Sequence, residues 1–173
     1  MVTVVDMVEV DGPDRALSFV VVGEPPVQKP HKMGWRHLFG VLRKTNHHWI
    51  PFVEDPTAMK KAALRSAVRA AMEEFGITNF PYFDGHEPLT MVVKFSYERP
   101  ALFQPALFQP FPSTKSMANR VNLVSDACHG VLYARDDRAV TLLVGEKCFA
   151  PVGSGASTTV RIRKRNANDV EYW

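Results

Sequence analysis

The stretch that decides the fold reads Asn119-Arg-Val-Asn-Leu-Val-Ser-Asp126-Ala-Cys-His-Gly130-Val-Leu-Tyr-Ala-Arg-Asp136-Asp137-Arg-Ala-Val140. Apolar residues recur at helical spacing over residues 118–129, which predicts a helix with one apolar side. Glycine is the residue type that most often follows the end of a helix, so Gly130 is the predicted end of this one. The apolar segments 131–133 and 139–144 lie on either side of the acidic pair and predict two strands.

The segments farther from this stretch predict further strands and one more helix. Residues 18–22 form an apolar run that ends at Gly23, and residues 89–97 and 158–162 are rich in strand-forming residues. Asp55 and Pro56 suit the cap and the first turn of a helix that Gly76 ends. Its apolar face is predicted to consist of Ala63, Ala67, Ala70, Ala71 and Phe75. Because strands and helices do not strictly alternate, we predict an α+β fold with a mixed sheet and two helices packed on one face.

The length of 173 residues suits one domain with a sizeable core. We expect residues 1–17 to be an N-terminal extension with one short strand, at 2–5 or at 8–10. Residues 18–149 form the main domain, and residues 150–173 are a C-terminal strand and basic tail. Residues 24–54 form a connection long enough to be functional or disordered.

A perfect duplication of Pro-Ala-Leu-Phe-Gln occupies residues 100–104 and 105–109. Prolines at this interval disfavour both helix and strand pairing, so we predict an extended, exposed arm. A tolerated loop expansion is the simpler interpretation, and docking of its leucines and phenylalanines on a partner is the alternative.

The composition fits a packed globular protein inside the cell. Hydrophobic residues make up 46% and charged residues 23% of the chain. No apolar run approaches the roughly 18 residues that a membrane span needs. A signal peptide would have basic residues followed by an apolar stretch at the N-terminus, where this chain has the acids Asp6 and Glu9. The sequence therefore predicts no secretion signal. Cys128 and Cys148 lack CxxC spacing, so we expect two reduced thiols and no zinc site.

Positive charge is concentrated in two places, although the net charge is only +3. Between Glu24 and Glu54 there is no acidic residue, while five lysines and arginines and four histidines occur. A second basic cluster lies at residues 161–165. Two interpretations remain open, namely a solvated loop and tail, or two phosphate-contacting patches on one face.

The stretch quoted first resembles the signature of RusA-type Holliday junction resolvases. In that family a carboxylate-bearing turn precedes a helix that ends in Asp-Ala-x-x-Gly, and a strand is entered through Asp-Asp-x-x-Val. Asp126-Ala127, Gly130, Asp136-Asp137 and Val140 stand at this spacing. Residues 19–32 resemble the family's first strand and its basic loop, residues 52–59 the approach to its first helix, and residues 146–147 its last charged strand. The resemblance covers residues 18–149.

The chain departs from the family pattern at the expected metal site. The family has roughly Pro-Asp-x-Asp-Asn-x-x-Lys before the second helix. Counting back from Asp126, the aspartates fall on Ser116 and Ala118 and the lysine on Asn122, while Asn119 matches. The resemblance implies magnesium-dependent hydrolysis of a phosphodiester, with magnesium held by carboxylates. Asp137 remains as the expected metal ligand, with Asp136 beside it as the second catalytic carboxylate. We therefore expect magnesium binding and catalysis to be impaired. Natural divergence and an engineered substitution at Ala118 both remain possible origins.

The resemblance implies a homodimer that faces a four-way DNA junction, without a membrane. The residues expected to contact phosphates are Lys29, His31, Lys32, Arg36, Lys115 and Arg120. Three functions remain open at this point. The first is a RusA-like nucleic-acid-binding domain with impaired catalysis. The second is an active endodeoxyribonuclease that uses Asp126, Asp136 and Asp137. The third is a structural RNA-binding subunit of a larger assembly such as an organellar ribosome.

Overall fold

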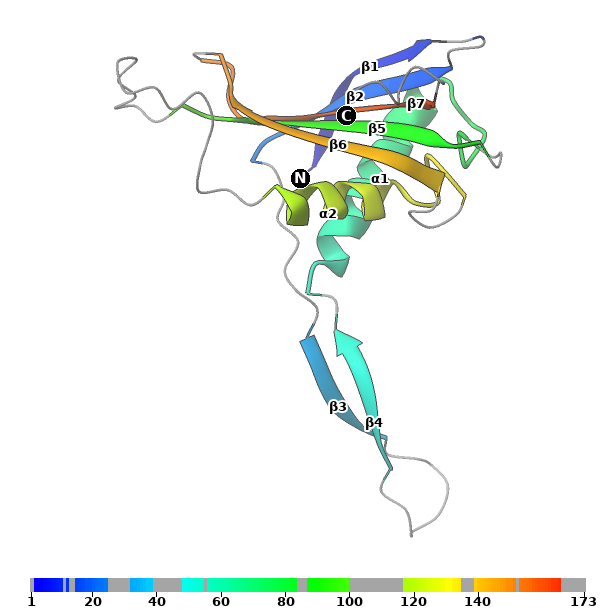
Figure 1. Cartoon of the computed structure of the whole chain (residues 1–173), viewed down its shortest axis with the longest axis vertical. Coiled ribbons are helices and arrows are strands. Elements are labelled where there is room, and N and C mark those ends of the chain that lie inside the picture. The colour runs from blue at the N-terminus through cyan, green and yellow to red at the C-terminus, as the bar shows by residue number, and fades with distance from the viewer. Residues whose placement is uncertain are drawn as a thin grey trace.

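The computed structural model describes residues 2–10, 12, 15–24, 32–38, 48–54, 56–83, 87–99, 117–134, 139–151 and 153–165; for 32–38 and 48–54 it describes the backbone. These residues form a five-stranded sheet and a separate two-stranded sheet. Both helices lie against the same face of the larger sheet (Figure 1). The predicted α+β fold, with a mixed sheet and two helices on one face, is therefore confirmed.

The five-stranded sheet has the order β1-β2-β7-β5-β6. Its strands are β1 (Thr3–Val10), β2 (Ala16–Val22), β5 (Leu89–Tyr97), β6 (Val140–Phe149) and β7 (Ser157–Lys164). β5 and β6 are parallel, and the other neighbours are antiparallel. Alternate residues of β2, β5 and β7 point into the core, because successive side chains of a strand face opposite sides of the sheet.

Helix α1 (Ala58–Glu74) packs through a different face from the one predicted. Its buried side chains are Leu64, Val68 and Met72, one helical turn apart, while Phe75 is 48% exposed. The prediction counted alanines, but the larger side chains bury more apolar area and decide which face packs. The N-cap position is Thr57 and not Asp55 as predicted, and the Thr57 side chain makes no capping hydrogen bond to the helix.

Helix α2 (Ala118–Cys128) ends as predicted, but the segment after it is not a strand. Gly130 has φ +81°, a conformation that glycine adopts without strain. Residues 131–133 form a turn whose carbonyls accept hydrogen bonds from the amides of Tyr82 and Phe83. The apolar run reflects burial under the sheet and not pairing in it, since Tyr133 is 1% exposed.

The N-terminal extension belongs to the sheet. The two candidate segments, 2–5 and 8–10, are halves of one strand, β1, which is interrupted by a register shift between Val5 and Val8. Asp6 has φ +52° within this bulge. The Tyr82 hydroxyl donates a hydrogen bond to Glu9 at 2.6 Å, which ties β1 to the segment before β5.

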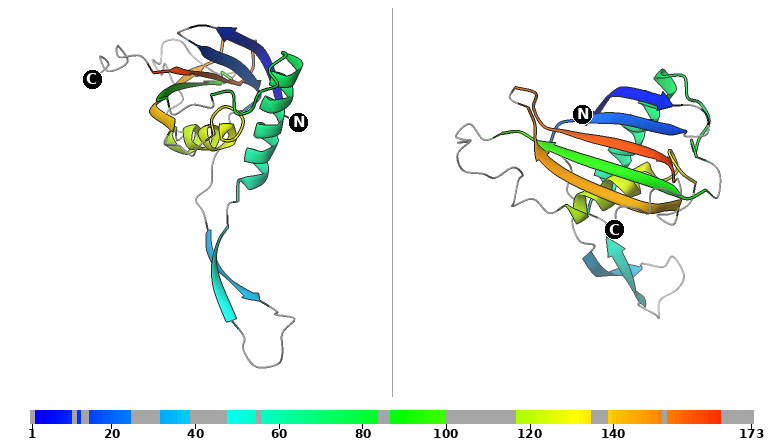
Figure 2. Two further views of the ribbon diagram at one scale, coloured as in Figure 1. Left: turned by 90° about the vertical axis from the view of Figure 1, so that its right-hand side faces the viewer. Right: turned by 45° about the horizontal axis from the view of Figure 1, so that its top comes forward.

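The connection 24–54 contains a hairpin that the sequence did not predict. Strands β3 (Lys32–Leu38) and β4 (His48–Glu54) pair antiparallel, with Lys32 opposite Glu54. The hairpin projects away from the larger sheet in both views (Figures 1 and 2). A two-stranded hairpin on its own is only marginally stable in water.

Other predictions concern particular residues. Cys128 is buried and Cys148 is half-buried, and both are free thiols, as predicted. The duplicated arm at 100–109 lies outside the described residues. Within the part of the chain that is described, neither helix has the length and hydrophobicity that crossing a bilayer requires.

Candidate functional site

The first turn and a half of α2 carries two of the positions where the resemblance places the metal site, Ala118 and Asn122. Ala118 begins the helix and Asn122 lies about one turn farther on. Ala118, Asn119 and Asn122 are all exposed, so this side of α2 is open to solvent. The sheet fixes the position of the turn, because Met117 and Val121 pack on Gly145 of β6.

Arg120 points into the protein from the same turn. Its side chain is 4% exposed, and its guanidinium lies 5.4 Å from the centre of the Tyr97 ring, at the end of β5. Burial raises the pKa of the Tyr97 hydroxyl, Arg120 opposes this shift, and the charge of Glu24 adds to it. This buried position differs from the exposed one that a phosphate contact requires.

The other end of α2 is held by two basic residues of α1. The Lys61 ammonium forms an ion pair with Asp126 at 2.5 Å. Arg65, one turn farther along α1, donates hydrogen bonds to the backbone oxygens of Asp126 at 3.0 Å and Ala127 at 3.2 Å. Positive charge at the C-terminal end of a helix is stabilising, because the free carbonyls there carry partial negative charge. Asp126 therefore has a structural role in joining the two helices.

The described neighbours of the acidic pair lie near the start of β6, whereas α2 begins beside Gly145, in the middle of that strand. Tyr133 pairs with Phe83 ahead of β5, and β6 begins at Val140, opposite Leu89. α2 runs in the reverse direction to β5 and β6, over about 16 Å for its 11 residues. Asp136 and Asp137 themselves lie outside the described residues.

Several other predicted site residues also lie outside the described part. These are Lys29, His31, Lys115 and Ser116. Lys32 and Arg36 belong to the backbone of β3, and their side chains are not described. Their proposed contacts with phosphates remain predictions.

The described residues do not fit a magnesium ion at the start of α2. Ala118 offers a methyl group where the family has a carboxylate, and Asn122 offers a neutral amide. Asp126 lies at the far end of the helix and is paired with Lys61. Within the described ranges, no three histidine, cysteine or acidic side chains gather closely enough to hold a metal ion.

The second basic cluster is divided between the two faces of the sheet. Arg161 is exposed on β7 and Arg163 is two residues farther along the same face, while Lys164 pairs with Glu87 at 2.8 Å. Lys94 of β5 lies on the face of the arginines, and the sequence analysis did not single it out. Residues 90, 94 and 96 are polar and stand at strand spacing, and this pattern could have identified Lys94 as a residue of that face.

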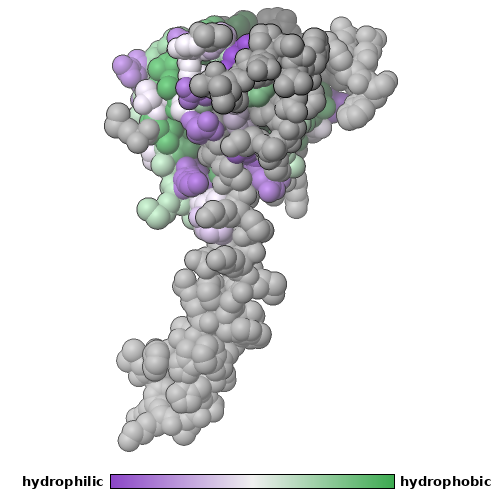
Figure 3. All heavy atoms as spheres, turned by 90° about the vertical axis from the view of Figure 1, so that its left-hand side faces the viewer, coloured by the Kyte–Doolittle hydropathy of each residue, from purple (hydrophilic) through white to green (hydrophobic). Residues whose placement is uncertain are grey.

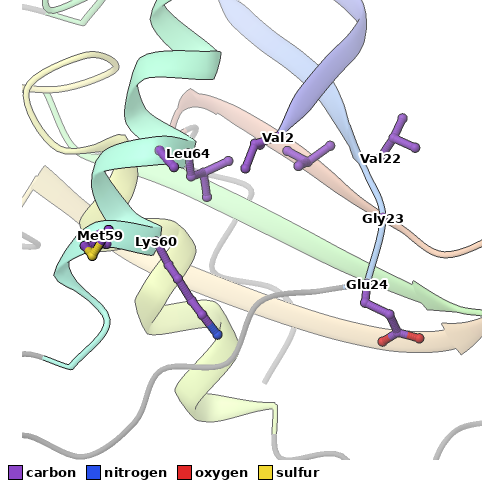
Figure 4. A pocket seen from close by; sticks show the side chains of 9 residues that line it. Val2, Val22, Gly23, Glu24, Met59, Lys60 and Leu64 are labelled. Carbon is purple, nitrogen blue, oxygen red and sulfur yellow. The ribbon is translucent and has the colours of Figure 1, made fainter.

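A surface pocket of about 440 Å³ lies between α1 and the ends of β1 and β2 (Figure 4). Its walls are mainly valine, leucine and alanine side chains, and Lys60 and Glu24 stand at its rim. The pocket resembles small-molecule sites in size, but its apolar walls hold no convergent set of polar groups. On the side of the molecule shown in Figure 3, hydrophilic and hydrophobic residues of the described surface are interspersed.

Comparison with known proteins gives no independent assignment. No protein-family model matches the chain, and no curated protein matches its sequence significantly. The resemblance to RusA-type resolvases therefore depends on the residues quoted above.

Proposed function

We propose that this chain binds nucleic acid through a RusA-like domain and does not cleave it. The observation that carries the proposal is the exposed start of α2, where Ala118, Asn119 and Asn122 occupy the positions of the family's metal-binding motif. The surface is open to a ligand, but the family's carboxylates are absent from it. Phosphate binding needs basic groups and not metal ligands, so binding can persist where catalysis is lost.

The arrangement around α2 supports the resemblance. The predicted helix, the turn at Gly130 and the entry into β6 at Val140 follow one another as the family signature implies. Helix, turn and strand would arise in many α+β proteins, however, so the particular residues carry more weight than the elements.

Two features support the loss of catalysis. Loss of one catalytic group commonly lowers the rate about 10²-fold or more, and three positions of the motif are substituted. In addition, Asp126 is paired with Lys61, which removes it as a substitute ligand.

Binding is tested by fluorescence anisotropy with a labelled four-way DNA junction, a linear duplex of the same arm sequence and an RNA duplex. We expect the junction to bind more tightly than the duplex, with an affinity that falls steeply as salt increases, because phosphate contacts release counterions. No difference between junction and duplex would contradict the RusA-like assignment. A preference for the RNA duplex would favour the ribonucleoprotein alternative.

The catalytic part of the proposal is tested by restoring the acids. The double variant Ser116→Asp with Ala118→Asp is compared with the wild type in junction cleavage with magnesium, and Asn119→Asp serves as a charge control. If only the metal ligands were lost, the double variant gains magnesium-dependent nicking and the control does not. Nicking by the wild type would contradict the proposal.

Sedimentation of the free protein and of its junction complex tests the homodimer that the resemblance implies. Two copies on one junction would support it, whereas a single bound copy would contradict it.

A further inference from the structure

The backbone register of the β3–β4 hairpin divides its residues between two faces. Successive residues of a strand alternate between the faces, and residues directly opposite each other share one. Trp35 is opposite Pro51, and His37 is opposite Trp49. The face that holds these four residues, here called the tryptophan face, also holds Met33 and Val53. The charged residues of the two strands all belong to the other face, namely Lys32, Arg36 and Glu54.

The two tryptophans occupy neighbouring positions on the tryptophan face. Trp49 stands two residues before Pro51, the residue opposite Trp35, so the tryptophans are diagonal to each other across the strands. Diagonal positions are about 7–8 Å apart, which is within the reach of aromatic residues. Trp35 is at the middle of its strand, and Trp49 is nearer the end that projects farthest from the larger sheet (Figure 1).

The hairpin stands apart from the main core. It forms a sheet of its own, and the described helices and the larger sheet all lie beyond its base (Figures 1 and 2). A projecting face with two tryptophans and no charged residue is typical of an interaction site, because a packed core does not require it.

The charge of the surrounding chain favours an anionic occupant. Residues 25–53 contain five lysines and arginines and no aspartate or glutamate. Two of these basic residues, Lys32 and Arg36, are on the face opposite the tryptophans. Aromatic residues beside basic ones are the combination by which proteins hold single-stranded nucleic acid, since bases stack on the rings and cations follow the phosphates. A duplex keeps the faces of its bases inside the stack, so the matching occupant has unpaired bases.

We propose that the tryptophan face binds unpaired bases of a nucleic acid, with Trp35 and Trp49 as the stacking residues. The inference rests on the proposed nucleic-acid function and adds to it a base-binding surface separate from the exposed start of α2. A membrane is a poorer match, because Arg36 and Glu54 on the other face of the thin hairpin would be costly to bury in lipid.

Stacking is tested by tryptophan fluorescence of the full-length chain with Trp173→Phe, in which the hairpin tryptophans are the emitting ones. The variant is titrated at low salt with a thymidine oligonucleotide of about 12 nucleotides and with a duplex of the same length. We expect the single strand to quench the emission at least about two-fold more than the duplex, because its bases are free to stack. Binding seen by fluorescence anisotropy without quenching would overturn the inference and leave the proposed function standing. Absence of binding to both probes and to the four-way junction would overturn both.

Alanine substitution tests whether the affinity depends on the two rings. Trp35→Ala and Trp49→Ala are each expected to weaken binding of the oligonucleotide about ten-fold and to leave its salt dependence unchanged, because a stacking contact and no phosphate contact is lost. Arg36→Ala is expected instead to reduce the salt slope by about one.

Phe52→Ala is the matched control, because it removes an aromatic residue from the other face of the same hairpin. It should weaken binding much less than Trp49→Ala. An equal loss in these two variants, or a reduced salt slope in the tryptophan variants, would overturn the inference, since the hairpin as a whole and not its tryptophan face would then determine binding.

Vesicles of phosphatidylserine and phosphatidylcholine test the other occupant. We expect the emission of the Trp173→Phe variant to stay unchanged when vesicles are added. A blue shift with vesicles, together with no quenching by the oligonucleotide, would identify a lipid surface as the occupant and overturn the inference.

Discussion

Gly145 shows how one residue holds α2 against the sheet. A β-carbon at this position would lie 2.8 Å from Val121 and 3.1 Å from Met117. Contacts under 3 Å force a neighbour to move, and a valine on a helix has little freedom to do so. The absence of a side chain at position 145 therefore allows α2 to lie close to β6.

Gly145→Ala is expected to lower the free energy of unfolding by about 1–2 kcal/mol, because overpacking outweighs the small gain from restricting the unfolded chain. Urea denaturation measures the difference. Val144→Ala, on the opposite face of β6, is the control and should cost less. Equal stability of Gly145→Ala and the wild type would show that α2 does not approach β6 this closely.

Arg65 and Arg69 form a matched pair of arginines on α1. Arg65 donates hydrogen bonds to carbonyls at the end of α2, whereas Arg69 pairs with Glu73 on the same helix in an exposed position. We expect Arg65→Met to destabilise the protein by about 1–3 kcal/mol, because it leaves part-buried carbonyls without donors. Arg69→Met should cost less, about 0.5–1 kcal/mol, because it loses an exposed ion pair with Glu73 and a contact with the Phe80 ring. Thermal unfolding of both variants distinguishes the two roles, and a larger loss for Arg69→Met would contradict them.

Cys128 and Cys148 are expected to differ in reactivity. Burial raises the pKa of the Cys128 thiol to about 12, so at pH 8 it stays protonated in the folded protein. The thiolate is the reactive form, and Cys128 is also shielded from reagents. Titration with a thiol reagent should therefore show one fast group, lost in Cys148→Ser, and a second group that reacts only on unfolding. Fast labelling of Cys128 in the folded state would contradict this.

At the scale of elements, the sequence correctly predicted those helices and strands that depend on local patterns. Helix α2, its end at Gly130 and strands β2, β5 and β7 follow from periodicity and glycine chemistry. The β3–β4 hairpin was missed, and β1 was predicted only as one of two shorter alternatives, because a distant pairing and a bulge depend on contacts that a local pattern does not contain. The segment 131–133 was mistaken for a strand, since a short apolar run can equally mark burial in a turn.

The β3–β4 hairpin is predicted to serve binding and not stability. It forms its own sheet, and the chain around it carries the basic run between Glu24 and Glu54. Replacement of residues 30–55 by a short glycine-serine linker should leave the unfolding midpoint nearly unchanged. The same deletion should weaken junction binding and reduce its salt dependence, because phosphate contacts are lost.

A large fall in the unfolding midpoint of this deletion would show that the hairpin supports the core. Unchanged junction affinity, with an unchanged salt slope, would remove the basic run from the proposed interface.

At the scale of the molecule, the sheet separates surfaces that the sequence analysis grouped together. α2 and its exposed start lie on one face, and Arg161 and Arg163 lie on the other. The spacing of the apolar residues identified α2 as the helix that carries the candidate site, because a helix produces a pattern that is visible in a short stretch of sequence. It did not reveal that Arg120 is buried or that Asp126 is bound by Lys61, since both depend on packing between distant elements.

The central claim is that the chain holds a branched nucleic acid without cutting it. The most direct measurement incubates a labelled four-way junction with the protein and magnesium, then analyses one sample on native and denaturing gels. We predict a shifted complex on the native gel and full-length strands on the denaturing gel. Symmetric magnesium-dependent nicks, or a junction that stays unbound at low salt, would contradict the account.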